Sequence, residues 1–174
     1  MNMQFFITRF RANAEALERL LKDIDGAHAT WRPSPEKWSI RDVMCHMYDE
    51  ERFDFRVRFD MTINKPGKKW PGFDPIAWVT EHDYASKDLH EQLHLFLAER
   101  RKSIAWLETV ENPNLSMSYT HPRLGDITAG SMLGSWLAHD YLHMRQIARL
   151  NYQYLAGLVA PHALDYAGLW NPNG

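Results

Sequence analysis

The chain has 174 residues, a length that suits one domain of ordinary size. Apolar residues make up 45% and charged residues 24%, and seven Trp, seven Tyr and eight Phe provide enough apolar surface to exclude disorder as the main state. Lys and Arg number 20 against 22 Asp and Glu. The formal net charge is -2, so the chain lacks the positive excess of a general nucleic-acid binder.

The sequence also restricts the location of the chain and the kind of metal site that it can build. No apolar run approaches the roughly 18 residues of a membrane span, and Arg9 and Arg11 precede any long apolar stretch, unlike in a secretory signal. We therefore expect a cytoplasmic chain with a single domain over residues 1–174. Its one cysteine, Cys45, excludes an internal disulfide and a multi-cysteine zinc site, and is expected to be a small buried residue.

The first predicted helix runs from about Met3 to Ile24. Asp25-Gly26 is a stop signal, because Gly readily takes the left-handed conformation that follows a helix. A loop with Pro33 and Pro35 then prevents the helix from continuing. The residues with helical spacing that should face the core are Phe6, Phe10, Leu17, Leu20, Leu21 and Ile24.

The second predicted helix begins at Ser39, whose hydroxyl can cap the free backbone N–H groups, with Asp42 at the reciprocal position of a capping box. It should end before Lys65-Pro66-Gly67. The long loop that follows contains Asp74-Pro75, a favourable start for a short helix, because Pro suits the first turn. The expected inward face of the second helix consists of Ile40, Val43, Met47, Val57 and Met61.

Two further helices are predicted, from about Ser86 to Val110 and from about Thr128 to Leu150. The segment between them, which includes HPRLGD, is expected to be a loop, and few segments have the period-two alternation of a strand. The apolar tail after Leu150 should pack on the body or on another subunit. Four long amphipathic helices predict an all-α fold, a four-helix bundle. The expected core residues of the last two helices are Leu89, Leu93, Phe96, Leu97, Ile104, Leu107, Met132, Leu133, Trp136, Ile147 and Leu150.

The clearest chemical feature is the pair His139 and His143, which lie one helical turn apart. With Met132 at zero and a step of about 100° per residue, His139 falls at about -20° and His143 at about 20°, inside the core stripe. Two buried imidazoles need partners for their nitrogens, and one metal ion could satisfy both.

On the second helix, the same count with Val43 at zero places His46 at about -60° and Glu50 at about -20°. His46 is therefore the natural third ligand, and three imidazoles would leave a position open for water or substrate. Metal binding should then weaken below about pH 6, because free imidazole has a pKa near about 6.5. The residues alone are equally consistent with three hydrogen-bonded core histidines.

Glu50 is the candidate catalytic residue, because it lies one turn after His46 and could act as general base, as support for the ligands or as a fourth ligand. An ion pair with an Arg, for example Arg145, is an equally weighted alternative. Asp42 could orient His46 or only cap its helix, and Asp140 falls off the seam, as a supporting or structural residue.

The other histidine pair, His90 and His94, falls on the flank of its helix and is expected at the surface or an interface. Glu91 and His94 form a Glu-x-x-His motif. The second such motif that a ferritin-like di-iron site requires is missing.

Two stretches resemble the DinB superfamily, whose members are also called DinB/YfiT-like metalloenzymes. They are WRPSPEKWSIRDVMCHMYDEE, which leads from a Trp-rich loop into the second helix, and HPRLGDITAGSMLGSWLAHDYLHMRQIARL, which contains the paired histidines. The resemblance implies a four-helix bundle with a divalent metal, zinc or nickel first, held by His46, His139 and His143.

The resemblance does not select one reaction. Some members of the family are transferases or isomerases that use a low-molecular-weight thiol, and metal-dependent hydrolysis is the other reaction that we expect. The implied protein is thus a metalloenzyme with a small-molecule substrate, and a homodimer because of its apolar tail. The alternative is a stress-linked dimer that binds metal without catalysis.

Overall fold

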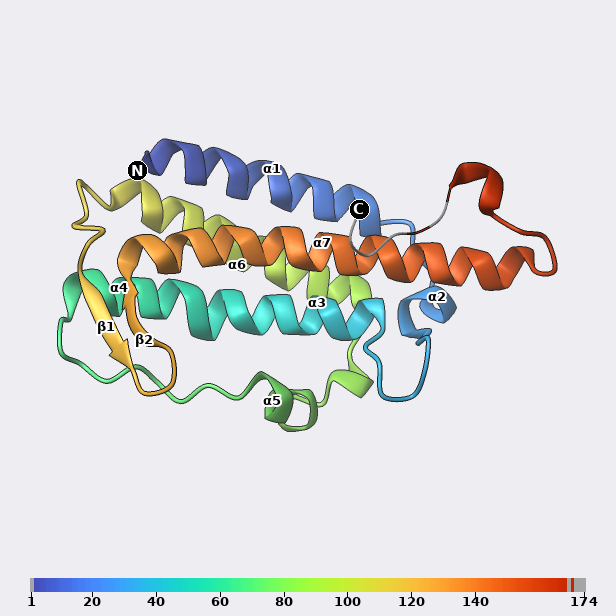
Figure 1. Ribbon diagram of the computed structural model, residues 1–174, viewed down its shortest axis with the longest axis horizontal. Helices are drawn as coiled ribbons and strands as arrows, with labels where there is room; N and C mark the ends of the chain where they lie inside the picture. The colour runs from blue at the N-terminus through green and yellow to red at the C-terminus, as the bar shows by residue number, and fades with distance from the viewer. Residues whose placement is uncertain (1, 169, 171–174) are drawn as a thin grey trace.

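Four long helical segments run side by side in the computed structural model, which describes residues 2–168 and 170 (Figure 1). They are α1 (Met3–Leu21), a continuous segment made of α3 (Ile40–Asp49), η1 (Glu50–Phe55) and α4 (Arg56–Asn64), α6 (Leu89–Thr109) and α7 (Ala129–Val159). The remaining elements are α2 (Gly26–Thr30), α5 (Pro75–Glu81), η2 (Tyr84–Ser86), η3 (Asp165–Ala167) and the strands β1 (Ser118–His121) and β2 (Gly125–Thr128). The predicted four-helix bundle is confirmed.

Helix starts follow the capping signals of the sequence. Ser39 and Asp42 form the predicted capping box, with the Ser39 Oγ accepting from the Asp42 N–H at 3.2 Å and Asp42 accepting from the Ser39 N–H at 2.9 Å. Asp74 caps α5, and Pro75 occupies its first turn. Thr128 caps α7. These local hydrogen bonds fix where the site-bearing helices begin.

The core fills the space between the helices with two apolar clusters. One cluster joins α1, α3, α6 and α7, and the other joins the N-terminal half of α1 to α4, α6 and α7. A fully buried large side chain such as Trp136 or Phe96 contributes about 1.5–3 kcal/mol. All eleven core residues predicted for α6 and α7 are buried. On α1, Leu20 departs from its expected face and is 39% exposed.

The second long segment is not a uniform α-helix. Residues Glu50–Phe55 form a π-helix, in which backbone bonds reach from i to i+5, so the segment carries about one residue more per turn than an α-helix. The extra residue changes which side chains of the following α4 face the core. Val57 and Met61, predicted to face inward, are only half-buried, whereas Arg58 and Phe59 are buried instead.

Three other expectations need correction. The predicted first helix ends at Leu21 and is followed by the separate α2. The predicted loop contains an antiparallel hairpin, in which β1 pairs with β2 and Gly125 takes a φ of 71° at its turn. The fourth helix continues nine residues beyond Leu150, to Val159, because the start of the apolar tail is helical.

The tail packs partly on its own chain. Tyr154 stacks on His28 with ring centroids 3.9 Å apart, while Leu155 and Leu158 are 46% and 66% exposed. Leu169, which belongs to the same predicted apolar tail, lies outside the described residues. Within the part of the chain that the structure describes, no helix combines the length and the hydropathy needed to cross a membrane.

Candidate metal centre

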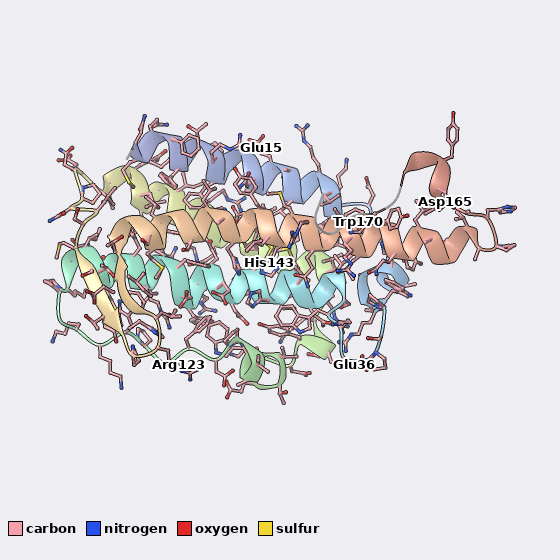
Figure 2. The ribbon with its side chains drawn as sticks, viewed as in Figure 1. Glu15, Glu36, Arg123, His143, Asp165 and Trp170 are labelled. Atoms are coloured by element: carbon pink, nitrogen blue, oxygen red, sulfur yellow. The ribbon has the colours of Figure 1, made fainter. Side chains whose placement is uncertain are left out.

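Three imidazoles from two helices converge near the middle of the bundle. His46 belongs to α3, and His139 and His143 lie one turn apart on α7. Figure 2 labels His143. The His46 and His139 Nε2 atoms are 3.2 Å apart, and the His139 and His143 Nε2 atoms are 3.0 Å apart. One nitrogen from each ring lies within 4.8 Å of the other two. The structure therefore brings together the three histidines that the face count selected.

Hydrogen bonds alone satisfy this arrangement poorly. A neutral imidazole Nε2 carries either one proton or one lone pair, so the His139 Nε2 cannot make good hydrogen bonds to both of its neighbours. A metal bound at about 2.0–2.1 Å in a tetrahedral site places its nitrogen ligands about 3.3 Å apart, close to the separations seen here. The donor set therefore fits a divalent cation.

Gln146 orients one of the rings. Its Oε1 lies 2.8 Å from the His143 Nδ1, so an Nδ1–H can donate to it and leave the Nε2 lone pair directed at the cluster. The sequence analysis missed this role, although Gln146 lies one turn after His143. His46 has no such partner for its Nδ1 among the described residues, and its ring packs on Trp38, with centroids 4.9 Å apart.

Burial keeps the cluster neutral. Burial, and next the charge of His143, lowers the pKa of His46 to about 3. Burial and the charges of its two neighbours lower the pKa of His139 to about 2, and burial also lowers that of His143. At neutral pH the rings hold lone pairs that can bind a cation. These lowered pKa values predict that proton competition for the site begins at a lower pH than for free imidazole.

Glu50 faces the same cluster from the first turn of the π-helix. Its Oε1 lies 3.6 Å from the His46 Nε2, and its side chain is buried. Burial, and next the charge of Asp54, raises the pKa of Glu50 to about 8, although Arg58 lowers it. The alternative pairing with Arg145 is wrong within the described residues, because Arg145 is exposed and makes no ion pair with Glu50 there.

Aromatic and charged side chains form the surroundings of the cluster. The Phe55 ring centroid lies 5.0 Å from that of His139. Farther along the same segment, Asp54 pairs with Arg58 at 2.7 Å, and the Arg58 guanidinium lies 4.9 Å from the Trp70 ring centroid. Trp70 belongs to the long segment between α4 and α5. This segment is thus attached to the helix that carries Glu50.

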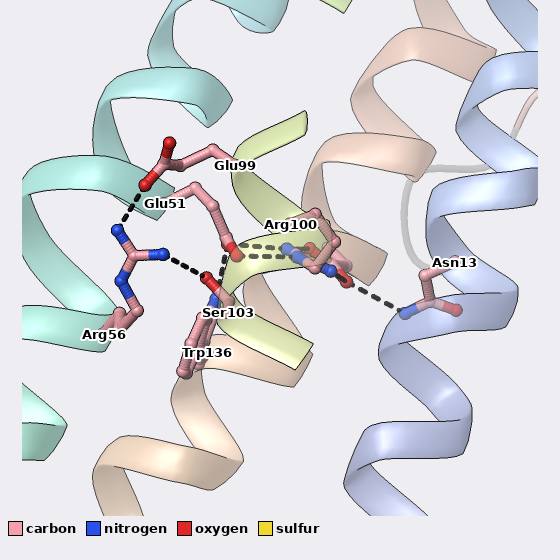
Figure 3. Close-up of polar contacts among 8 residues, drawn as sticks. Asn13, Glu51, Arg56, Glu99, Arg100, Ser103 and Trp136 are labelled. Atoms are coloured by element: carbon pink, nitrogen blue, oxygen red, sulfur yellow. Dashed lines mark hydrogen bonds and ion pairs between the residues drawn. The ribbon is translucent and has the colours of Figure 1, made fainter. Parts of the chain in front are cut away.

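A buried polar and ionic network links the four helical segments of the bundle through α1, η1, α6 and α7 (Figure 3). Arg100 of α6 donates to Glu51 through Nε and Nη2, both at 2.9 Å, and to Asp140 through Nη1 at 2.7 Å and Nη2 at 2.8 Å. The Trp136 Nε1 donates to Glu51 at 2.7 Å, and the Asn13 Nδ2 donates to Asp140 at 3.1 Å. Since Glu51 follows Glu50 and Asp140 follows His139, this network fixes the two site-bearing helices relative to each other.

The remaining candidates lie outside the cluster. His90 and His94 are exposed on α6, as predicted. Asp42 caps α3 and pairs with Arg32 at 2.8 Å, so it does not orient His46. Cys45 is buried, and its pKa is raised to about 12 by burial and next by the charge of Asp42, so it is a poor thiolate nucleophile.

The chain belongs to the DinB superfamily, whose model matches residues 9–147. That range contains all three histidines as well as Glu50 and Gln146.

Two known proteins are similar to this chain. A protein of Oceanobacillus iheyensis with the name "Putative metal-dependent hydrolase" is 23% identical over 140 residues, which cover 78% of this chain and 80% of the relative. The structure of YfiT from Bacillus subtilis, described as a probable metal-dependent hydrolase with an unusual four-helix bundle topology, superposes with a TM-score of 0.77. The two chains share 19% sequence identity over 87% of each, so this likeness shows the fold.

Proposed function

We propose that this chain is a metal-dependent hydrolase of a small molecule, with a divalent cation held by His46, His139 and His143. The observation that carries the proposal is the convergence of the Nε2 atoms of one buried and two half-buried histidines, 3.2 and 3.0 Å apart. Zinc and nickel are the first candidates, because both accept imidazole ligands. The names of the relatives favour hydrolysis over thiol transfer.

The residues of the proposed site have different roles. The three imidazoles offer lone pairs, and Gln146 holds the His143 ring in the tautomer that exposes its Nε2. When bound, a divalent cation acidifies a water or thiol ligand, polarises a substrate oxygen and favours the ionised form of a neighbouring carboxylate. Glu50 then accepts the proton of the attacking water and returns it to the leaving group.

The first test is the metal content of single variants. The His143→Ala variant should bind metal at least about 10- to 100-fold more weakly, because even the loss of a residue that supports a ligand costs that much. The control is His90→Ala, which removes an exposed imidazole from α6. Metal analysis by mass spectrometry, followed by titration of metal-free protein, measures both. Stoichiometric tight binding in all three cluster variants, His46→Ala, His139→Ala and His143→Ala, would mean that these residues are core histidines.

The second test separates catalysis from metal storage. Glu50→Gln keeps the size and the hydrogen-bonding capacity of the side chain but removes the proton acceptor. It should retain metal and lose about 10²- to 10⁴-fold in the rate of hydrolysis, measured with a panel of ester, amide and phosphoester substrates. A parallel screen with low-molecular-weight thiols and electrophiles tests for thiol-transferase activity, the alternative reaction. Turnover only in the thiol screen contradicts the hydrolase, and metal binding without turnover in either screen supports the non-enzymatic alternative.

A further inference from the structure

A cavity opens between the start of α4, the chain that follows α4, and α6. Its volume is about 770 Å³, within the range of small-molecule sites. Apolar side chains of Val57, Met61 and Trp106 contribute to its wall. The charged residues that line it are Arg56, Asp60, Lys65, Lys68, Lys69 and Lys102.

The charges of this cavity do not cancel. Lys65 pairs with Asp60 at 2.9 Å, which neutralises one cation. Arg56 and Lys102 share a single carboxylate, that of Glu99, and so leave one positive charge in excess.

Lys68 and Lys69 make no ion pair within the described residues. Three positive charges therefore remain uncompensated at one cavity of a chain whose formal net charge is -2.

The local backbone places the two free lysines. Gly67 takes a φ of 77°, and the Lys68 N–H donates to the Lys65 carbonyl at 3.1 Å, so the chain turns back immediately after α4. This turn brings Lys68 and Lys69 to the cavity wall that also contains Trp106, a residue of α6. The cationic side is thus built by a specific turn and faces an aromatic residue.

We propose that this cavity binds a phosphomonoester with an apolar or aromatic body. The phosphate dianion would lie against Lys68 and Lys69, with Arg56 or Lys102 as the third cation, and the body would pack on Trp106 and Met61. A monoanion would leave the three charges less well balanced, and a bare inorganic anion would leave the apolar wall in water.

This ligand site is separate from the histidine cluster. Phe55 and Arg56 are neighbours in sequence, yet the Phe55 ring faces His139 while the Arg56 guanidinium turns to α6, where its Nη1 donates to the Ser103 Oγ at 3.2 Å. None of the three cluster histidines lines the cavity. The inference therefore stands whether or not the metal site catalyses hydrolysis.

The test uses 1-naphthylmethylphosphonate, whose C–P bond resists hydrolysis, and the metal-loaded full chain. Titration calorimetry should give a Kd at least about tenfold lower than for 1-naphthylmethanol, which lacks the charge, or methylphosphonate, which lacks the aromatic body. In amide and indole NMR spectra, the probe should shift the signals of Lys68, Lys69 and the Trp106 side chain.

Charge-removing variants locate the binding. Lys68→Gln with Lys69→Gln should weaken binding of the probe by about tenfold. The matched control is Lys22→Gln with Lys37→Gln, which removes the same charge near the other end of the bundle and should leave the Kd unchanged (Figure 1).

Three results of these titrations would overturn the proposal. The first is that the lysine pair has no effect on the Kd. The second is that binding is lost instead in His143→Ala, which would place the phosphonate on the metal. The third is that methylphosphonate binds as tightly as the naphthyl probe, which would show that the apolar wall contributes nothing. Vesicles of anionic lipid provide a further arm. Binding to the vesicles without binding of the soluble probe contradicts a small-molecule site.

Discussion

At the scale of single residues, the candidate site depends on neutral imidazoles. His46 and His139 keep their lone pairs because burial makes the protonated forms unfavourable, and the pKa values fall to about 3 and 2. Gln146 also orients one ring. A His143 Nδ1–H that donates to the Gln146 Oε1 leaves the lone pair of the His143 Nε2 directed at the cluster. The same burial acts oppositely on Glu50, whose pKa rises to about 8.

These pKa shifts predict an unusual pH dependence of metal binding. Three exposed imidazoles with a pKa of about 6.5 would lose roughly 10⁴-fold in affinity between pH 7 and pH 5, because each must lose a proton to bind. Here the pKa values of His46 and His139 are lowered to about 3 and 2 and that of His143 is also lowered, so we expect a loss below about 25-fold, which is what one imidazole of ordinary pKa would give. The measurement is a chelator competition in the Glu50→Gln background, which removes the titration of that carboxylate.

The lowered histidine pKa values also affect the free energy of unfolding of the metal-free chain, where they cause a loss as the pH falls. Histidines whose pKa is lowered on folding stabilise the chain above about pH 6.5, and this contribution is lost as the pH falls from there toward 3. Glu50 and Asp54, whose pKa values are raised to about 8 and 6, act in the opposite direction over part of this range. Urea unfolding of metal-free protein should therefore show a free energy of unfolding that falls more steeply below pH 6.5 in Glu50→Gln than in Glu50→Gln with His46→Ala. Metal affinity that collapses at pH 6 would mean that the rings are solvated.

At the scale of elements, the ion pairs of Arg100 join the π-helix, α6 and α7 (Figure 3). We expect these ion pairs to contribute most to fixing the three segments in their positions along the bundle axis. Arg100→Met leaves Glu51 and Asp140 as unpaired buried carboxylates and should lower the free energy of unfolding by about 3–5 kcal/mol. The matched control is Arg100→Met with Glu51→Gln and Asp140→Asn, which still provides acceptors for Trp136 and Asn13.

The control variant should regain much of the lost stability, because replacing a buried ionic group by neutral groups is often close to neutral in free energy. Urea unfolding at pH 7 measures both variants. A single variant as stable as the original chain would mean that water reaches the carboxylates. A control variant as unstable as Arg100→Met would mean that lost packing of the Arg100 side chain, and not unpaired charge, causes the destabilisation.

The elements also explain how far the sequence could predict the site. Face counting placed His46, Glu50, His139 and His143 correctly because all four lie where the helix is regular or at the first residue of the π-helix. It failed for Val57 and Met61, which follow the π-helix, because a constant step of 100° cannot anticipate a wide turn.

Other features depend on contacts between distant parts of the chain. The pairing of Arg100 with Glu51 and Asp140 joins three helices, so no local pattern announces it. The hairpin Ser118–His121 with Gly125–Thr128 is too short for alternation to be visible, and it is stabilised by stacking of Tyr119 on Trp70, a residue far away in sequence, at 4.1 Å. Caps, in contrast, are local and could be predicted at Ser39, Asp74 and Thr128.

At the scale of the whole molecule, α7 extends past the body of the bundle, and its outer part is the remaining apolar surface (Figure 1). Tyr154 is engaged with His28 and Trp31 in the same chain, whereas Leu155 and Leu158 are 46% and 66% exposed. We therefore expect the interface of the predicted homodimer at the end of this helix, because exposed apolar patches commonly mark contacts between copies.

We expect light scattering at micromolar concentration to give about 41 kDa, twice the chain mass of 20.4 kDa. Leu155→Glu with Leu158→Lys should give the mass of one chain without changing metal content, because neither residue contacts the histidine cluster. The matched control, Ile76→Glu, changes the most exposed apolar residue of α5, which is 80% exposed, and should leave the dimer intact. A mass of about 20 kDa for the unmodified chain would mean that the end of α7 is covered by something other than a second copy, and dissociation by Ile76→Glu would move the interface to α5.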